Sequence, residues 1–287
     1  MEIKKNEPMK NHTSFKIGGP ADEFCEVTSE EEIKRLIDYA SEKGMSYTVM
    51  GNGSNLLVAD GGIRGLVIKV ARGFDEISVG GEKITAQSGA LLSRIASAAY
   101  RNSLTGLEFA SGIPGTLGGG IYMNAGAYGG ELKDVIESVT YLDNGEIITK
   151  TADMLEFGYR KSSFTDKDYI ILSAELKLKK GNPDEIKEKT DDYRQRRTSK
   201  QPLDMPSAGS TFKRPEGYFA GKLIEDSGLK GFKIGGAQVS EKHSGFVVNA
   251  GGATAADVKA LIEHIQKTVK EKLGVEMKTE VKMLGDF

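Results

Sequence analysis

The chain has 287 residues, with 39 Lys and Arg against 41 Asp and Glu, which gives a length suited to about two domains and a formal net charge of −2. The balanced charge argues against a nucleic-acid-binding protein, and the single cysteine, Cys25, excludes an intramolecular disulfide and a thiolate-cluster metal site. Residues 1–5 are charged where a signal peptide would be apolar, and no apolar stretch is long enough to span a membrane, so we expect a cytoplasmic protein that binds neither membrane nor nucleic acid.

A helix is predicted over residues 29–43. Ser29 and Glu32 have the spacing of a capping box, and Gly44 follows the last apolar position. Between these ends the apolar residues recur at helical spacing: Ile33, Leu36, Ile37 and Ala40. Further along the chain, apolar and alternating runs predict strands over residues 47–50, 56–58, 64–70, 135–142 and 169–178.

The composition changes between residues 179 and 206, where charged residues dominate and prolines stand at 183, 202 and 206. This pattern predicts a charged surface helix followed by a linker, and hence a domain boundary near 180–205. The last long helix begins at the capping pair of Thr254 and Asp257 and ends before Gly274. A short strand is predicted over residues 276–284.

A glycine loop, residues 51–55, separates the first two predicted strands. Successive backbone N–H groups of its Gly, Asn and Ser residues can form an anion-binding nest that a diphosphate could approach. An ordinary turn between strands fits the same residues and is favoured by the loop alone. The loop is not a Walker loop, because no Gly-Lys-Ser/Thr follows, and it lacks the third glycine and the helix of a dinucleotide fingerprint.

A second glycine-rich segment runs from residue 111 to residue 130. The chain has 36 glycines among its 287 residues, a proportion well above the usual value of about 7%. In this segment the glycines stand among large apolar residues such as Leu117, Ile121 and Tyr122. Glycine in such company indicates ordered backbone that passes close to another group. A ligand of the size of a flavin or a nucleotide and a purely structural role explain this segment equally well.

The sequence lacks the residue patterns of several other common active sites and metal sites. No Gly-x-Ser-x-Gly nucleophile elbow occurs, and His12, His243 and His264 show no spacing typical of metal ligands. His264 lies beside apolar positions of the last helix, which favours a structural role. Cys25 fits a small buried side chain better than a nucleophile. We therefore expect no metal site.

Several segments, in this order, resemble the UDP-N-acetylenolpyruvoylglucosamine reductase family, the MurB flavoenzymes, over nearly the whole chain: residues 13–19, 51–55, 112–115, 124–129, 159–164, 208–213 and 280–281. The resemblance implies an α+β fold. Residues 1–180 would form a two-part FAD-binding domain of the vanillyl-alcohol-oxidase type, with sub-lobes of about 1–70 and 71–180. A charged helix and linker (181–204), a smaller α+β substrate-binding domain (205–275) and a tail that returns to the flavin (276–287) would follow.

The family's reaction has two halves, which the resemblance extends to this chain. NADPH reduces FAD, and reduced FAD passes hydride from N5 to the β-carbon of UDP-N-acetylglucosamine enolpyruvate, giving UDP-N-acetylmuramate for peptidoglycan and so for cell shape and division. The resemblance assigns the catalytic positions to Arg160, Ser210 and Glu280. Arg160 and a protonated Glu280 would stabilise the enolate, and Ser210 would deliver the proton to the α-carbon.

The resemblance also assigns the binding residues. FAD would be held without a covalent bond, because residues 51–55 contain no histidine, by the two glycine-rich segments and one arginine: Met50, Gly51, Asn52, Gly53, Ser54, Asn55, Gly112, Ile113, Pro114, Gly115, Gly119, Asn124, Ala125, Gly126 and Arg197. The UDP-sugar would contact Tyr128, Lys213 and Lys222, with both lysines near its diphosphate. An ordinary surface position explains either lysine equally well.

The stretch between Lys180 and Lys200 is too short for the tyrosine lid of the family's longer branch, so the chain resembles the shorter branch. Arg214 stands where the longer branch has a substrate-binding asparagine. Two other functions stay open: an FAD-dependent alcohol or sugar oxidase of the same fold, and a flavin-binding or nucleotide-sugar-binding module without turnover. We expect a monomer.

Overall fold

The computed structural model describes residues 1–287, which form two compact units. The first unit comprises residues 1–2, 25–52 and 68–197, and the second comprises residues 3–24, 53–67 and 198–287. The predicted division places residues 3–24 and 53–67 in the first sub-lobe of the FAD-binding domain. In the structure these residues pack with the C-terminal residues. None of the helices combines the length and the apolar character needed to cross a bilayer.

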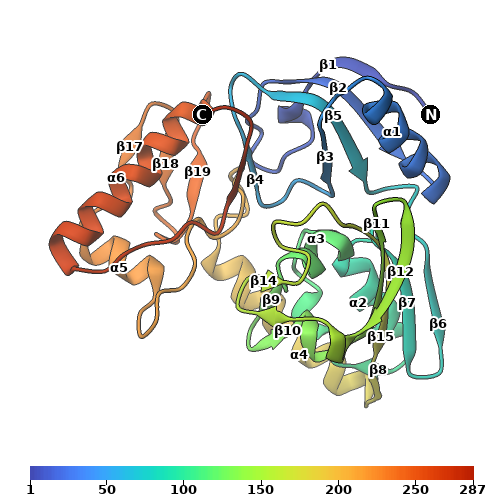
Figure 1. Ribbon diagram of the computed structural model, residues 1–287. Coiled ribbons are helices and arrows are strands. Elements are labelled where there is room, and N and C mark those ends of the chain that lie inside the picture. Colours follow the sequence, from blue (N-terminus) through green and yellow to red (C-terminus); the bar gives the residue numbers. More distant parts are fainter. The chain divides into compact units, whose positions relative to one another are not determined.

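The first unit is built around a five-stranded antiparallel sheet in the order β12-β11-β15-β7-β6 (Figure 1). Its strands are β6 (Ile77–Gly80), β7 (Lys83–Gln87), β11 (Ile136–Asp143), β12 (Glu146–Thr151) and β15 (Ile170–Lys177). The strands predicted over residues 135–142 and 169–178 are confirmed as β11 and β15. β15 lies at the centre of the sheet and buries Leu172, Ala174 and Leu176.

Helices α2 (Leu92–Arg101) and α3 (Leu117–Tyr122) contact this sheet and share its apolar core. The charged stretch forms α4 (Pro183–Lys200), in which Ile186 is the one buried residue. Short pairs of strands complete the unit: β8 (Leu104–Thr105) with β16 (Lys179–Lys180), β9 (Gly126–Ala127) with β10 (Gly130–Glu131), and β13 (Phe157–Gly158) with β14 (Lys161–Ser162).

Helix α1 (Glu30–Glu42) confirms the first predicted helix, with Ser29 as its N-cap. The hydroxyl of Ser29 accepts the Glu32 N–H at 3.2 Å, as a capping box requires. The Glu32 carboxylate, however, accepts from Thr28 and not from the Ser29 N–H, so the predicted box is half formed. Thr28 offers both its N–H (2.8 Å) and its hydroxyl (3.0 Å), which gives the carboxylate two donors.

A four-stranded sheet has the order β1-β2-β5-β3. Its strands are β1 (Lys4–Pro8), β2 (Pro20–Val27), β3 (Tyr47–Met50) and β5 (Ile63–Val70), and β3 and β5 confirm two predicted strands. Within β2 and within β5 the chain passes from one unit to the other. Cys25 in β2 is fully buried, and burial raises the pKa of its thiol, as expected for a packed side chain that is not a nucleophile.

The second unit contains a three-stranded antiparallel sheet of β17 (Lys233–Ile234), β18 (Ala237–Val239) and β19 (Val247–Asn249). Helix α6 (Ala255–Leu273) packs on this sheet and on α5 (Ala220–Asp226). The predicted capping box of Thr254 and Asp257 is present, and Gly274 ends the helix in a left-handed conformation with φ 71°. The His264 ring stacks on Phe232 with centroids 4.6 Å apart, which fits the structural role expected for it.

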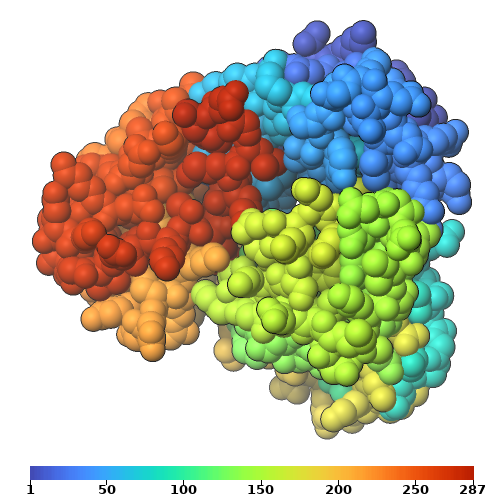
Figure 2. Space-filling view, in the orientation of Figure 1, coloured from blue at the N-terminus to red at the C-terminus, as the bar shows by residue number.

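The C-terminal residues lie on the surface of the second unit, dark red in Figure 2. Strand β20 (Lys282–Leu284) pairs in parallel with β4 (Leu56–Val58), which confirms the predicted strand over residues 56–58. The prediction of a strand over residues 276–284 is wrong for residues 276–281. That stretch makes a single bridge, from Thr279 to Phe212, which is too short to continue a ladder.

Asp60, between β4 and β5, holds the start of α6. Its carboxylate accepts the N–H groups of Ala255 (2.8 Å) and Ala256 (3.0 Å), which have no partner inside the helix. We expect Asp60→Ala to lower the free energy of unfolding by about 1–2 kcal/mol, because both the acceptor and a charge that favours the helix dipole are lost. Urea denaturation measures this. Asp60→Asn keeps one acceptor oxygen and should lose less; an Asp60→Ala protein as stable as wild type would contradict the assignment.

Candidate functional site

The predicted site residues are divided between the two units. Those in the first unit are Met50, Gly51, Asn52, Gly112, Ile113, Pro114, Gly115, Gly119, Asn124, Ala125, Gly126, Tyr128, Arg160 and Arg197. Those in the second unit are Gly53, Ser54, Asn55, Ser210, Lys213, Lys222 and Glu280.

In the first unit, the start of the glycine loop meets the second glycine-rich segment. A Cβ added to Gly51 would lie 2.2 Å from the Thr116 hydroxyl oxygen, so any other residue there would displace the Thr116 side chain. The Asn52 amide donates to the carbonyl of Pro114 at 2.8 Å. Two segments that are distant in the sequence, and that the family resemblance assigns to the same ligand, therefore lie in contact.

The backbone at this junction is open to solvent. Asn52, Gly112, Pro114 and Gly119 are all exposed. A Cβ added to Gly119 would have only the Thr116 hydroxyl within reach, at 3.5 Å, so packing does not require glycine at this position. An exposed glycine surface lets a flat ring or a diphosphate approach the main chain. These residues thus fit FAD, for which a side chain at Gly119 would be an obstacle.

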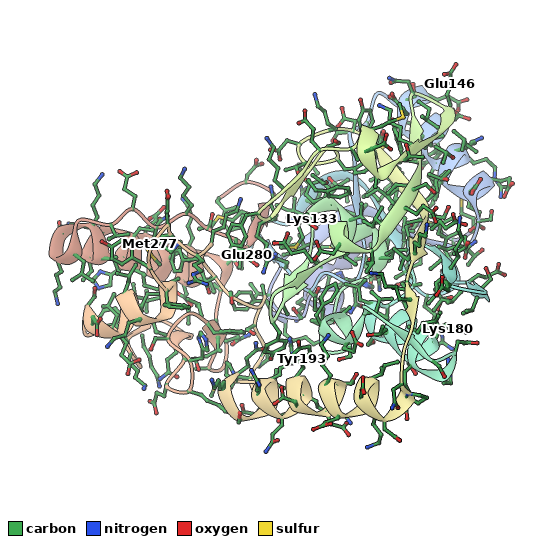
Figure 3. The ribbon with its side chains drawn as sticks, turned by 90° about the horizontal axis from the view of Figure 1, so that it is seen from below. Lys133, Glu146, Lys180, Tyr193, Met277 and Glu280 are labelled. Carbon is green, nitrogen blue, oxygen red and sulfur yellow. The ribbon has the colours of Figure 1, made fainter.

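Helix α4 contacts both ends of the second glycine-rich segment. The Tyr193 ring, labelled on this helix in Figure 3, stacks on Tyr128 with centroids 4.5 Å apart and an interplanar angle of 11°. One turn later, Cδ of Arg197 lies 3.0 Å from the position that a Cβ on Gly112 would take. Burial lowers the pKa of Arg197 and raises that of Tyr128, the latter against the opposing effect of the Arg197 charge. The helix therefore fixes two predicted ligand contacts from one face.

Arg160 lies at the turn between β13 and β14. Its φ is 53°, a left-handed backbone that costs a residue with a side chain on the order of 1–3 kcal/mol and is often found at functional sites. The guanidinium donates to the carbonyl of Gly126 at 3.0 Å and lies 5.1 Å from the centroid of the Tyr159 ring. The structure thus brings Arg160 to the second glycine-rich segment.

Asn124 is fully buried and uses its side chain within the protein. The amide nitrogen donates to Glu131 and to the carbonyl of Gly158, both at 3.0 Å, and the amide oxygen accepts the Lys133 N–H at 3.0 Å. The bond to Gly158 holds the segment to the hairpin of β13 and β14, which carries Arg160 at its turn. A contact between Asn124 and FAD would therefore come from its backbone.

In the second unit, the structure brings Ser210 and Glu280 to neighbouring positions. The segments that carry them run antiparallel and meet at the bridge from Phe212 to Thr279. The N–H of Glu280 donates to the Thr211 carbonyl at 2.8 Å, so the predicted proton donor is the residue directly before this contact. The far end of the glycine loop joins the same group, because the Asn55 carbonyl accepts the Lys282 N–H at 3.0 Å.

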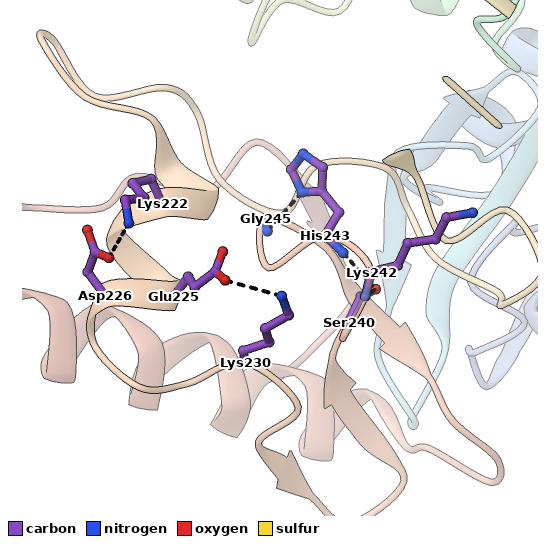
Figure 4. A network of polar contacts seen from close by, with 8 residues as sticks. All are labelled: Lys222, Glu225, Asp226, Lys230, Ser240, Lys242, His243 and Gly245. Carbon is purple, nitrogen blue, oxygen red and sulfur yellow. Dashed lines mark hydrogen bonds and ion pairs between the residues drawn. The ribbon is translucent and has the colours of Figure 1, made fainter. Parts of the chain in front are cut away.

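The two predicted diphosphate lysines have different surroundings. Lys213 is half-buried, and its backbone N–H donates to the Lys278 carbonyl at 2.8 Å. Lys222 is exposed on α5 and pairs with Asp226 at 2.6 Å (Figure 4). Exposed ion pairs contribute little to stability, so an incoming phosphate could replace Asp226 as the partner of Lys222.

Two threonines that the sequence analysis missed organise these groups. Thr116 contacts Gly51 and caps α3, and the preference for threonine as the residue before a helix is a signal that could have found it. Thr211 is 1% exposed and bonds to residues from two other segments. No local sequence pattern predicts the role of Thr211, because its hydrogen-bond partners lie far away in the sequence.

Comparisons with known proteins agree over both units. Residues 21–151 match the family of FAD binding domains, and residues 201–284 match the family described as UDP-N-acetylenolpyruvoylglucosamine reductase, C-terminal domain. The predicted α+β fold class is confirmed: an FAD-binding domain is followed by the C-terminal domain of this reductase family.

Relatives match nearly the whole chain. UDP-N-acetylenolpyruvoylglucosamine reductase from Caldanaerobacter subterraneus subsp. tengcongensis is 56% identical over 98% of this chain and 93% of its own. The enzyme of that name from Clostridioides difficile is 54% identical over 99% of this chain and 94% of its own. The crystal structure of UDP-N-acetylenolpyruvylglucosamine reductase (MurB) from Thermus caldophilus superposes with a TM-score of 0.86 at 36% identity, covering 99% of this chain and 98% of that one.

Gly119→Ala tests whether the open surface binds flavin. Alanine is favoured over glycine inside a helix by about 1 kcal/mol, so the protein without flavin should be no less stable, as thermal unfolding would show. The affinity for FAD, titrated through flavin fluorescence, should fall by at least about tenfold, because the methyl group would point into open space that the ligand needs. Gly80→Ala, at an equally open glycine in the hairpin between β6 and β7, is the control. Equal affinities of the two variants would contradict the placement.

Proposed function

Because the chain belongs to the UDP-N-acetylenolpyruvoylglucosamine reductase family and is an FAD-containing oxidoreductase, we propose that it uses NADPH to reduce the enolpyruvyl group of UDP-N-acetylglucosamine enolpyruvate to UDP-N-acetylmuramate for peptidoglycan synthesis. The resemblance seen in the sequence is confirmed by identities above one half over almost the full length. Membership of this family favours a reductase over the predicted alternatives, an oxidase or a module without turnover.

The observation that carries the proposal is the pairing of the segments of Ser210 and Glu280 in the second unit. When bound and reduced by NADPH, FAD would supply the hydride that the β-carbon of the enolpyruvyl ether receives. The negative charge that develops on the α-carbon and the carboxylate needs donors that are already in place. Ser210 holds the proton that the α-carbon receives, and a protonated Glu280 donates a hydrogen bond to the enolate.

Arg160 is proposed to bind the substrate carboxylate. Its planar guanidinium matches a carboxylate and stays charged at any working pH. Support comes from the bond to the Gly126 carbonyl, which restricts the side chain before substrate arrives, and from the left-handed backbone, which the fold maintains despite its cost. Lysine could not reproduce this fork with a single ammonium group.

The remaining assignments concern binding. FAD is proposed to be held without a covalent bond by the glycine loop, the second glycine-rich segment and Arg197, and the UDP-sugar by Tyr128, Lys213 and Lys222. The contact between Asn52 and Pro114 supports the cofactor assignment, since it joins the two glycine segments before any ligand binds. The stack of Tyr128 on Tyr193 supports the substrate assignment, because it fixes an exposed ring that a sugar nucleotide could meet.

Ser210→Ala separates the two half-reactions. Reduction of the flavin by NADPH should stay near the wild-type rate, whereas reoxidation by the enolpyruvyl substrate should slow by about 100-fold or more, because a general acid is lost. Anaerobic stopped-flow absorbance follows both steps, and Ser207→Ala in the same segment is the control. Equal slowing of both steps would mean that Ser210 positions the cofactor. Reoxidation by O₂ alone, with no response to the sugar nucleotide, would contradict the reductase.

A further inference from the structure

His243 occupies a tight slot in the loop between β18 and β19 of the second unit (Figure 4). Its Nδ1 accepts the N–H of Gly245 at 3.1 Å. Its Cε1 lies 2.9 Å and 3.2 Å from the positions that Cβ atoms on Gly245 and Gly221 would take, so a side chain at Gly245 would displace the ring and one at Gly221 would crowd it. The Phe246 ring meets it edge-on, with centroids 5.1 Å apart. The imidazole is therefore held in one orientation.

Gly245 also forms a hydrogen bond with the segment that carries Ser210. Its carbonyl accepts the N–H of Thr211 at 2.9 Å, and this N–H belongs to the peptide group that joins Ser210 to Thr211. Two hydrogen bonds thus connect the imidazole to the backbone of Ser210. Thr211 is held from two more sides, because its hydroxyl accepts the Val247 N–H at 2.9 Å and its carbonyl accepts the Glu280 N–H at 2.8 Å.

We propose that His243 is a positioning residue for Ser210 and acts through Gly245. This inference rests on the proposed role of Ser210 as the proton donor. Nδ1 accepts a hydrogen bond only while the imidazole is neutral with its proton on Nε2, because the protonated ring has a donor at both nitrogens. Protonation would place an N–H on Nδ1 opposite the N–H of Gly245, so the hydrogen bond between them would be lost. The peptide group that joins Ser210 to Thr211 would then no longer be anchored by a fixed Gly245.

Burial favours the neutral form of His243. Burial, the largest effect, lowers the pKa of His243; its own backbone and Glu225 oppose this, and Lys200 adds to it. The other charged groups of the neighbouring elements have partners: Lys222 with Asp226, Lys230 with Glu225, Lys242 with the Thr198 carbonyl, and Glu241 with Gln238. Since the pKa is lowered in the folded state, the anchor is fully present above about pH 6.5, the ordinary value for histidine, and is lost as the pH falls through the lowered one.

Two variants at this position separate positioning from packing. His243→Leu keeps bulk but removes the acceptor, and His243→Asn keeps an acceptor oxygen near Nδ1 that does not titrate. We expect His243→Leu to slow reoxidation by the enolpyruvyl substrate by about 10-fold to 100-fold, with reduction by NADPH unchanged, because a small displacement of a reacting group has effects of this size. His243→Asn should recover most of that rate and should lose the fall in reoxidation that wild type shows on the acid side.

The double variant of Ser210→Ala with His243→Leu tests the route through Ser210. If His243 acts only by positioning the hydroxyl, the double variant should reoxidise no more slowly than Ser210→Ala. Additive slowing, a His243→Leu protein as fast as wild type, or a His243→Asn protein that keeps the wild-type acid limb would each overturn the proposal. Should His243→Leu fail to fold, the pH profile of His243→Asn decides by itself.

The same measurements distinguish this inference from the proposed function. If Ser210→Ala leaves reoxidation unchanged, the proton-donor role is wrong and the positioning role falls with it. If Ser210→Ala slows reoxidation while His243→Leu does not, the proposed function stands and only the role of His243 is overturned.

Discussion

Four hydrogen bonds of Thr211 hold together the part of the second unit in which the chemistry is proposed. They join the serine segment to the loop before β19, to β19 itself and to the segment of Glu280. Because Thr211 is buried, a partner lost from any of these bonds would leave a polar group without compensation, which typically costs about 1–3 kcal/mol. The neighbours of Thr211 are therefore fixed in direction, as a preorganised proton donor must be.

In the first unit, the proposed site depends on glycines, which have no side chain. Gly51 closes on Thr116 and brings the glycine loop to the second glycine-rich segment, whereas Gly119 faces open space. Gly51 thus serves the packing of the protein, whereas Gly119 leaves open space beside the backbone, where we propose that FAD binds. The sequence shows both as the same letter, and only the surrounding atoms tell the two roles apart.

Local signals account for what the sequence could predict. The helix ends at Ser29, Thr254 and Gly274 depend on residues within one turn, and these predictions are confirmed. Residues 276–281 alternate like a strand, but pairing decides whether a strand forms, and their partners supply a single bridge. The side-chain bonds of Asn124 and the anchoring of Ser210 by Gly245 join segments from far apart in the chain, so no window of sequence reveals them.

The way the chain alternates between the units has a consequence for biosynthesis. The core of the second unit includes Phe15, Ile17 and Leu57 beside residues of α6, which emerge more than 190 positions later. Loop closure over such distances is slow, and the N-terminal residues lack their native partners until translation is nearly complete. A fragment that begins at residue 198 would expose the surface that these three side chains cover, so aggregation during expression is the expected fate of such a truncated piece.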